Sequence, residues 1–211
     1  MFKLLGLIFL LLGLSGCQTA TKEKIYSAAQ IDSLSNAFQV HLTNIETEFK
    51  NESWSPLTDE DKQLFKHINY YPYDISWRFE GPIQIYENPD SMIILGSKKG
   101  DERPALKYGY FHFEKDGKQN RLEIIKIFPT RPGHEAHLFL GFWDETSGNE
   151  TYSGGRYVDI AENDDNFYTI DFNYSYNPYC AYSARYSCAV PPFENRLEIA
   201  ITAGEKIFKE H

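Results

Sequence analysis

The sequence predicts a mainly β protein of the α+β class, built as an antiparallel barrel or sandwich of about nine strands with an N-terminal amphipathic helix and one short helix. Early in the chain, apolar residues recur every three or four positions, which is the helical period. After Pro72 they alternate with polar residues, and polar turns separate many short runs. This alternation is common to barrels and sandwiches, so both architectures stay open.

Two segments near the start have helical features. Between residues 25 and 49 one apolar stripe is made by Ile31, Leu34, Phe38, Leu42, Ile45 and Phe49. Thr58 followed by Asp61 is a variant of the capping box and predicts a short helix over residues 59–68.

Short runs with a period of two predict the strands. The clearest hairpin joins residues 107–113 to residues 121–128 through Asp116-Gly117, a pair that favours the positive backbone φ angles of a tight turn. Further strands are expected at 75–79, 83–85, 91–95, 136–143, 156–160, 167–172 and 197–201.

The first residues predict export. Lys3 precedes an apolar run over residues 4–14, which is shorter than the roughly 20 residues of a membrane-spanning helix and typical of a secretory signal. The run ends in Leu-Ser-Gly before Cys17 and so resembles a lipobox. We therefore expect a signal peptide over 1–16, lipidation of Cys17, a tether over 17–24 and a single domain over 25–211. An ordinary secreted protein is the alternative.

The net charge of the chain and the residue after Cys17 indicate where the protein is located and what it binds. Gln18 is not the Asp associated with inner-membrane retention, which favours an outer-membrane lipoprotein facing the periplasm in a bacterium with two membranes. The net charge of −9 argues against nucleic acid as a partner. The expected partners are the membrane, through the lipid, and a small polar ligand or an envelope protein.

Two cysteines remain once Cys17 carries lipid. An oxidising compartment favours a disulfide between Cys180 and Cys188. Free thiols and a two-thiolate metal site are alternatives, although no CxxC pair or neighbouring His completes a metal-ligand set. No metal and no cofactor is expected. His134 and His137 are expected to be exposed, because the spacing is not that of the helical HExxH motif.

Several ordered motifs resemble a known family. They lie at residues 55–58, 70–72, 144–152, 154–157, 171–182, 186–188, 191–195 and 203–206. Together these motifs resemble the domain of unknown function 1684 family of bacterial proteins, here as a lipoprotein. One departure is Ala189, where the family pattern has Pro. The resemblance covers nearly all of the chain after the signal and implies no particular activity.

The segment 171–195 is the candidate binding region, because long connections of this kind are commonly functional. Hydrogen-bonding and planar side chains suited to a polar ligand pocket are concentrated there, and Arg156 could join them to hold a carboxylate. The candidate ligand-binding residues are Arg156, Asp171, Asn173, Tyr176, Asn177, Tyr182, Glu194 and Asn195.

Three functions follow from this region. The favoured one is a noncatalytic envelope lipoprotein that binds a ligand or partner through residues 171–195. The first alternative is a periplasmic hydrolase of carbohydrate or cell-envelope substrates that uses Asp171 and Glu194 as its carboxyl pair. The second alternative is a purely structural lipoprotein, in which Arg156 pairs with Asp171 or Glu194 only to lock the loop.

Overall fold

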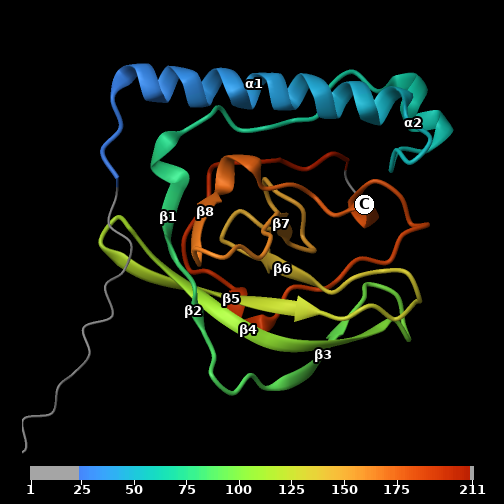
Figure 1. Cartoon of the computed structure of the whole chain (residues 1–211). Helices are drawn as coiled ribbons and strands as arrows, with labels where there is room; N and C mark the ends of the chain where they lie inside the picture. Colours follow the sequence, from blue (N-terminus) through green and yellow to red (C-terminus); the bar gives the residue numbers. More distant parts are fainter. Residues whose placement is uncertain (1–23, 210–211) are drawn as a thin grey trace, which may run out of the picture.

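The structure, a computed structural model, describes residues 24–209 (Figure 1). The expected signal peptide, Cys17 and nearly all of the tether lie outside the described residues and stay predictions. In chain order the elements are α1 (Ala28–Asn51), α2 (Asp59–Leu64), η1 (Ile75–Trp77), β1 (Arg78–Pro82), β2 (Gln84–Ile85), β3 (Ser91–Leu95), β4 (Glu102–Lys115), β5 (Lys118–Ile127), β6 (His137–Phe142), β7 (Arg156–Val158), β8 (Phe167–Asp171), η2 (Phe172–Tyr174), η3 (Tyr179–Ala181) and η4 (Phe193–Asn195).

The strands form two antiparallel sheets, which confirms the β-rich class. The larger sheet has the order β2-β4-β5-β6-β7, with β3 also paired to β4, and the smaller sheet pairs β1 with β8. Within the described residues the sheets do not close into a barrel, which leaves the sandwich alternative as the one consistent with the structure. The main core lies between the sheets and includes Phe111, Phe142 and Phe172, which are fully buried.

The local patterns placed most elements correctly. Asp116 and Gly117 adopt φ angles of 50° and 74° and join β4 to β5 in the expected hairpin. Thr58 caps α2 by accepting a hydrogen bond from the Asp61 amide, although the helix ends at Leu64. Residues 75–77 form the 3₁₀ turn η1 instead of a strand, because the Asp74 side chain accepts a hydrogen bond from the Ser76 amide.

The expected strand at 197–201 is wrong, although its alternating pattern is real. Leu197, Ile199 and Ile201 are buried, as the period of two predicts. Their backbone amides and carbonyls bond to residues 143–145 and to side chains instead of to a strand, so the segment is extended without belonging to a sheet.

Helix α1 lies across one end of the β structure (Figure 1). Its predicted apolar stripe faces inward: Phe38 and Phe49 are buried and the other stripe residues are partly buried. The Phe38 ring packs 5.7 Å from the ring of Tyr70 and 5.3 Å from that of Tyr174, which holds the helix against two separate loops. Among residues 24–209, no helix combines the length and apolar character needed to cross a bilayer.

The Phe38 contact gives a test of how α1 is held. We expect Phe38→Ala to lower the free energy of unfolding by about 3–5 kcal/mol, because a ring that is 1% exposed leaves a cavity. Val40→Ala on the same helix is the matched control, since Val40 is 61% exposed and should cost little. Urea denaturation measures both, and equal effects of the two changes would contradict the packing.

Candidate functional site

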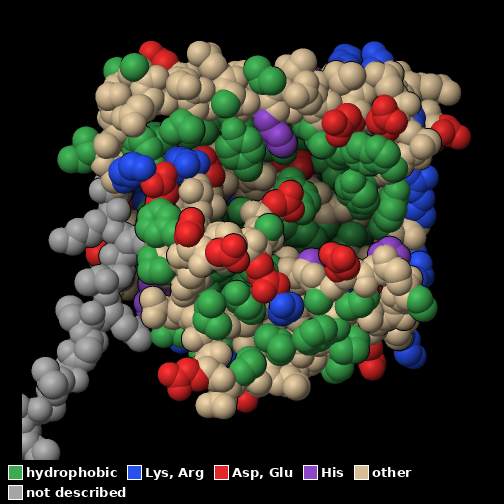
Figure 2. Space-filling model, in the orientation of Figure 1, with side chains coloured by type: hydrophobic (Ala, Val, Ile, Leu, Met, Phe, Trp, Pro, Cys, Tyr) green, Lys and Arg blue, Asp and Glu red, His purple; other side chains and the backbone are tan. Residues whose placement is uncertain are grey.

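A cavity of about 740 Å³ lies between α1, strands β6 and β7, and the segment 174–189. His41, Ile45 and Phe49 face it from α1, and Leu138, Phe139 and Leu140 face it from β6. Figure 2 shows a hollow beneath the helix, with hydrophobic side chains on its walls and acidic side chains around it. A cavity of this size and lining is typical of small-molecule sites.

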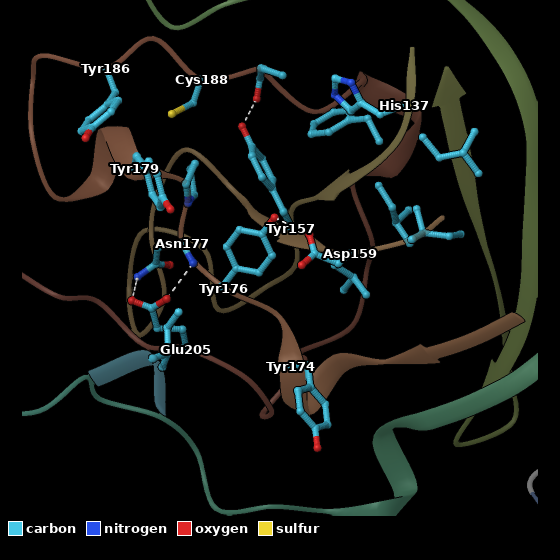
Figure 3. A pocket seen from close by; sticks show the side chains of 18 of the residues that line it. His137, Tyr157, Asp159, Tyr174, Tyr176, Asn177, Tyr179, Tyr186, Cys188 and Glu205 are labelled. Carbon is cyan, nitrogen blue, oxygen red and sulfur yellow. Dashed lines mark hydrogen bonds between the residues drawn. The ribbon is translucent and has the colours of Figure 1, made fainter. Parts of the chain in front are cut away.

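Tyrosines form much of the wall. The six that line the cavity are Tyr70, Tyr157, Tyr174, Tyr176, Tyr179 and Tyr186. Tyr157 and Tyr176 exchange backbone hydrogen bonds of 2.9 and 3.0 Å, which fasten the segment after β8 to β7. Their rings meet edge to face with centroids 5.9 Å apart, so two aromatic surfaces converge at this point (Figure 3).

Glu205 is the most deeply buried acidic residue of the wall. Its carboxylate accepts hydrogen bonds from the backbone amide of Asn177 at 2.8 Å and from the Asn177 side chain at 2.7 Å (Figure 3). The Tyr182 hydroxyl donates a third hydrogen bond to it. Burial raises the pKa of Glu205 to about 7, against these hydrogen bonds, which lower it.

Other charged groups line the cavity closer to solvent. Asp159 accepts a hydrogen bond from the Tyr176 hydroxyl at 2.6 Å, and burial lowers the pKa of His41 on the facing helix. Asp171 is paired with Arg78 at 3.2 Å, and Arg103 is paired with Asp101 at 2.8 Å. The charges of Asp171 and Arg103 are therefore already balanced by partners within the protein.

The structure brings only some of the predicted ligand residues to this cavity. Asp171, Tyr176 and Asn177 line it. Tyr182 is fully buried behind it and supports Glu205. The segment 171–195 is not a structureless loop, because the 3₁₀ turns η2, η3 and η4 divide it.

Arg156 does not line the cavity, in contrast to the sequence-based interpretation. Its side chain is buried and pairs with Asp144 at 3.1 Å, not with Asp171 or Glu194. It also donates hydrogen bonds to the backbone carbonyls of Ile201, Ala203 and Glu205. Arg156 therefore fixes the segment that carries Glu205 into the cavity wall.

Three more predicted ligand residues have structural roles. Asn173 is buried and bonds the backbone of Asp74 through both ends of its amide. Asn195 is buried and bonds the backbones of Glu123 and Gly141. Glu194 does not line the cavity and pairs with Lys107 at 2.8 Å at the surface. These side chains satisfy or neutralise groups of the protein itself.

The predicted disulfide is not present, because Cys180 and Cys188 are free thiols in the structure. The loop does bring them together: the Cys180 amide donates a hydrogen bond to the Cys188 sulfur at 3.1 Å. A hydrogen bond from the Cys188 thiol lowers the pKa of Cys180. Cys188 also lines the cavity.

Two residues that give the cavity its polar character, Glu205 and Asp159, have no clear functional signal in the sequence. Glu205 lies in the motif at residues 203–206, and Asp159 lies within the expected strand at 156–160 but belongs to no motif. His137 is exposed, as expected, but it also lines the cavity. Within residues 24–209 no cluster of three or more His, Cys, Asp or Glu side chains could hold a metal ion.

The comparisons with known proteins concern this same domain. A family model described as "Protein of unknown function (DUF1684)" matches residues 63–206. The solution NMR structure of an uncharacterized protein from Haloarcula marismortui is similar, with 29% identity and a TM-score of 0.62. The match covers 88% of this chain and 100% of that one. No curated protein matches the chain.

The ion pair of Arg156 can be tested by substitution. We expect Arg156→Met to lower the free energy of unfolding by about 3–5 kcal/mol, because the buried Asp144 carboxylate would lose its cation. Arg131→Met is the control, since Arg131 is exposed. Chemical denaturation measures both, and wild-type stability in Arg156→Met would show that the pair does not hold the C-terminal segment.

The raised pKa of Glu205 predicts a pH dependence of stability. Between its ordinary value of 4.5 and about 7, the folded protein binds more protons at this carboxyl than the unfolded chain. Stability contributed by Glu205 therefore falls as the pH rises through this range, by a few kilocalories per mole at most.

Glu205→Gln should flatten this part of the pH profile, and Glu198→Gln at an exposed position should not. Urea denaturation at a series of pH values separates the two variants. A Glu205→Gln profile parallel to that of the wild type would contradict the assigned pKa.

Proposed function

We propose a function for this chain from its own cavity, because the chain belongs, as its motifs suggested, to the DUF1684 family of proteins of unknown function. The proposed function is that of a lipid-anchored envelope protein that binds a small molecule in this cavity. The observation that carries the proposal is the cavity of about 740 Å³ with tyrosine-rich walls and the buried Glu205 carboxylate. Apolar walls with a few placed polar groups are the usual composition of a ligand site.

The lining changes the kind of ligand expected. The sequence suggested a small polar molecule held by polar side chains of residues 171–195. The walls instead combine aromatic rings with aliphatic side chains from β6, β7 and α1, alongside polar side chains such as Asp159, Asn177 and Glu205. The proposed ligand therefore has an aromatic or aliphatic body and a single polar end, because a polar body would lose its hydration without new partners.

Binding is favoured over hydrolysis by the positions of the two carboxyl groups named from the sequence. Asp171 lines the cavity but is paired with Arg78, and Glu194 lies outside the lining and is paired with Lys107. A glycosidase needs both carboxyl groups on either side of one bond. The pair Asp171 and Glu194 does not meet this requirement.

The envelope location rests on the sequence before the described domain. The apolar run behind Lys3 and the lipobox-like residues before Cys17 support export and lipid attachment. The chain enters the described structure at the N-terminal side of α1, the helix that covers the cavity (Figure 1). In this proposal the lipid holds the protein at a membrane, and the cavity takes up its ligand beside it.

A cavity-filling substitution tests ligand binding. Full-length protein in nanodiscs of zwitterionic lipid should bind the neutral aromatic 3-phenylpropan-1-ol with a dissociation constant of about 1 mM or tighter. Ile45→Trp should abolish this binding by filling the cavity, whereas Val40→Trp should not, because Val40 is exposed on the same helix and does not line the cavity.

Isothermal titration calorimetry measures the binding, with empty nanodiscs as the reference for partitioning into lipid. Equal binding by the Ile45→Trp variant and the wild type would place the probe elsewhere and would count against the cavity as the ligand site.

A further inference from the structure

We propose that the ligand of this cavity carries a protonated amine, recognised by Asn177, Glu205 and Asp159 against the tyrosine wall. The inference rests on the proposed function and goes further, because it assigns the chemistry of the ligand's polar end. It combines an unpartnered acceptor, two carboxylates that belong to no ion pair among the described residues, and converging aromatic rings.

Asn177 supplies the unpartnered acceptor. Within residues 24–209 its side-chain oxygen Oδ1 has no hydrogen-bond partner, although the residue is 1% exposed and lines the cavity. The other end of the amide donates to Glu205 at 2.7 Å and to the Lys206 carbonyl at 2.9 Å. Since both of these partners are acceptors, the amide nitrogen must face them, and the oxygen is left to accept from something else. The oxygen is itself buried, so a ligand N–H group meets this need through a shift of the side chains that cover it.

The charge of the lining points to a cation. None of the ion pairs among the described residues includes Asp159 or Glu205. Their hydrogen-bond donors are neutral: the Tyr176 hydroxyl for Asp159, and Asn177 and the Tyr182 hydroxyl for Glu205. A cationic group in the cavity would be attracted by these carboxylates, and one beside Glu205 would favour its ionised form.

The aromatic wall fits the same class of ligand. Tyr157 and Tyr176 lie beside Asp159, and Asn177 follows Tyr176 directly, so rings and acceptors share one region (Figure 3). An ammonium group is attracted to the face of an aromatic ring, and the attraction grows where water is excluded. The aliphatic residues of β6 and α1 then face the apolar body of the ligand.

Three probes with one carbon skeleton test the inference: 3-phenylpropylamine, 3-phenylpropan-1-ol and 3-phenylpropanoate, titrated into full-length protein in nanodiscs. We expect the amine to bind about tenfold more tightly than the alcohol and the carboxylate to show no saturable binding. Asp159→Asn should weaken the amine by about three- to tenfold and leave the alcohol unchanged. Asp165→Asn is the control, because it removes the same charge from an exposed residue that does not line the cavity, and it should leave both affinities unchanged.

The outcomes separate the inference from the proposed function. The inference is overturned if the alcohol binds as tightly as the amine, or if Asp159→Asn leaves the affinity for the amine unchanged. The cavity would then remain a ligand site that does not select for positive charge. Failure of all three probes to bind overturns both. The Glu205→Gln variant, if it folds, gives a second test. We expect it to bind the amine more weakly than the wild type does and to bind the alcohol equally well.

Discussion

Arg156 extends from strand β7 into the interior and donates hydrogen bonds to the backbone carbonyls of Ile201, Ala203 and Glu205. Within the described residues the C-terminal segment belongs to neither sheet and makes only isolated bridges, so these bonds supplement a ladder that is incomplete. Asp144 balances the buried charge and also accepts a hydrogen bond from the Ile201 amide at 2.7 Å. Burying this ion pair carries a desolvation cost, which the hydrogen bonds of the guanidinium offset in part. The Nε atom of Arg156 is buried and has no partner among residues 24–209. The result is a C-terminal segment held in one path, with the Glu205 side chain fixed at the cavity wall.

The cavity is assembled from parts that are distant in sequence. Strands β6 and β7 give its apolar floor, the segment 174–189 gives most of its tyrosines, and α1 closes it with Ile45 and Phe49. The matched family region begins at residue 63, so α1 lies outside it although the helix contributes to the wall. Asn177 links the segment 174–189 to Glu205, because its backbone amide and its side-chain amide both donate hydrogen bonds to the Glu205 carboxylate. The side-chain oxygen of Asn177 lacks a partner among residues 24–209.

Local pattern was sufficient for the elements whose hydrogen bonds are local. The stripe of α1 and the Asp116-Gly117 hairpin follow from periodicity and turn chemistry, and both are present. Residues 197–201 show what local pattern does not predict. Their alternating burial predicts an extended chain, but it does not say whether a neighbouring strand or the Arg156 guanidinium supplies the hydrogen-bond partners of the backbone. The pairing of Arg156 with Asp144 could not be predicted, because spacing in the sequence does not identify the partner of a buried arginine. Glu205 was missed because its burial depends on Asn177 and Tyr182, which are 28 and 23 positions away.

Native mass spectrometry of the protein purified from its own host tests the central claim most directly, because it weighs what the cavity holds without a choice of probe. A cavity that serves as a ligand site should retain a small molecule of one defined mass, bound one to one, that is released when the protein is denatured. Fragmentation of the released molecule would then show whether it carries an amine. If the protein has only the mass of its polypeptide and its covalent modifications at every gentle ionisation condition, the account is contradicted.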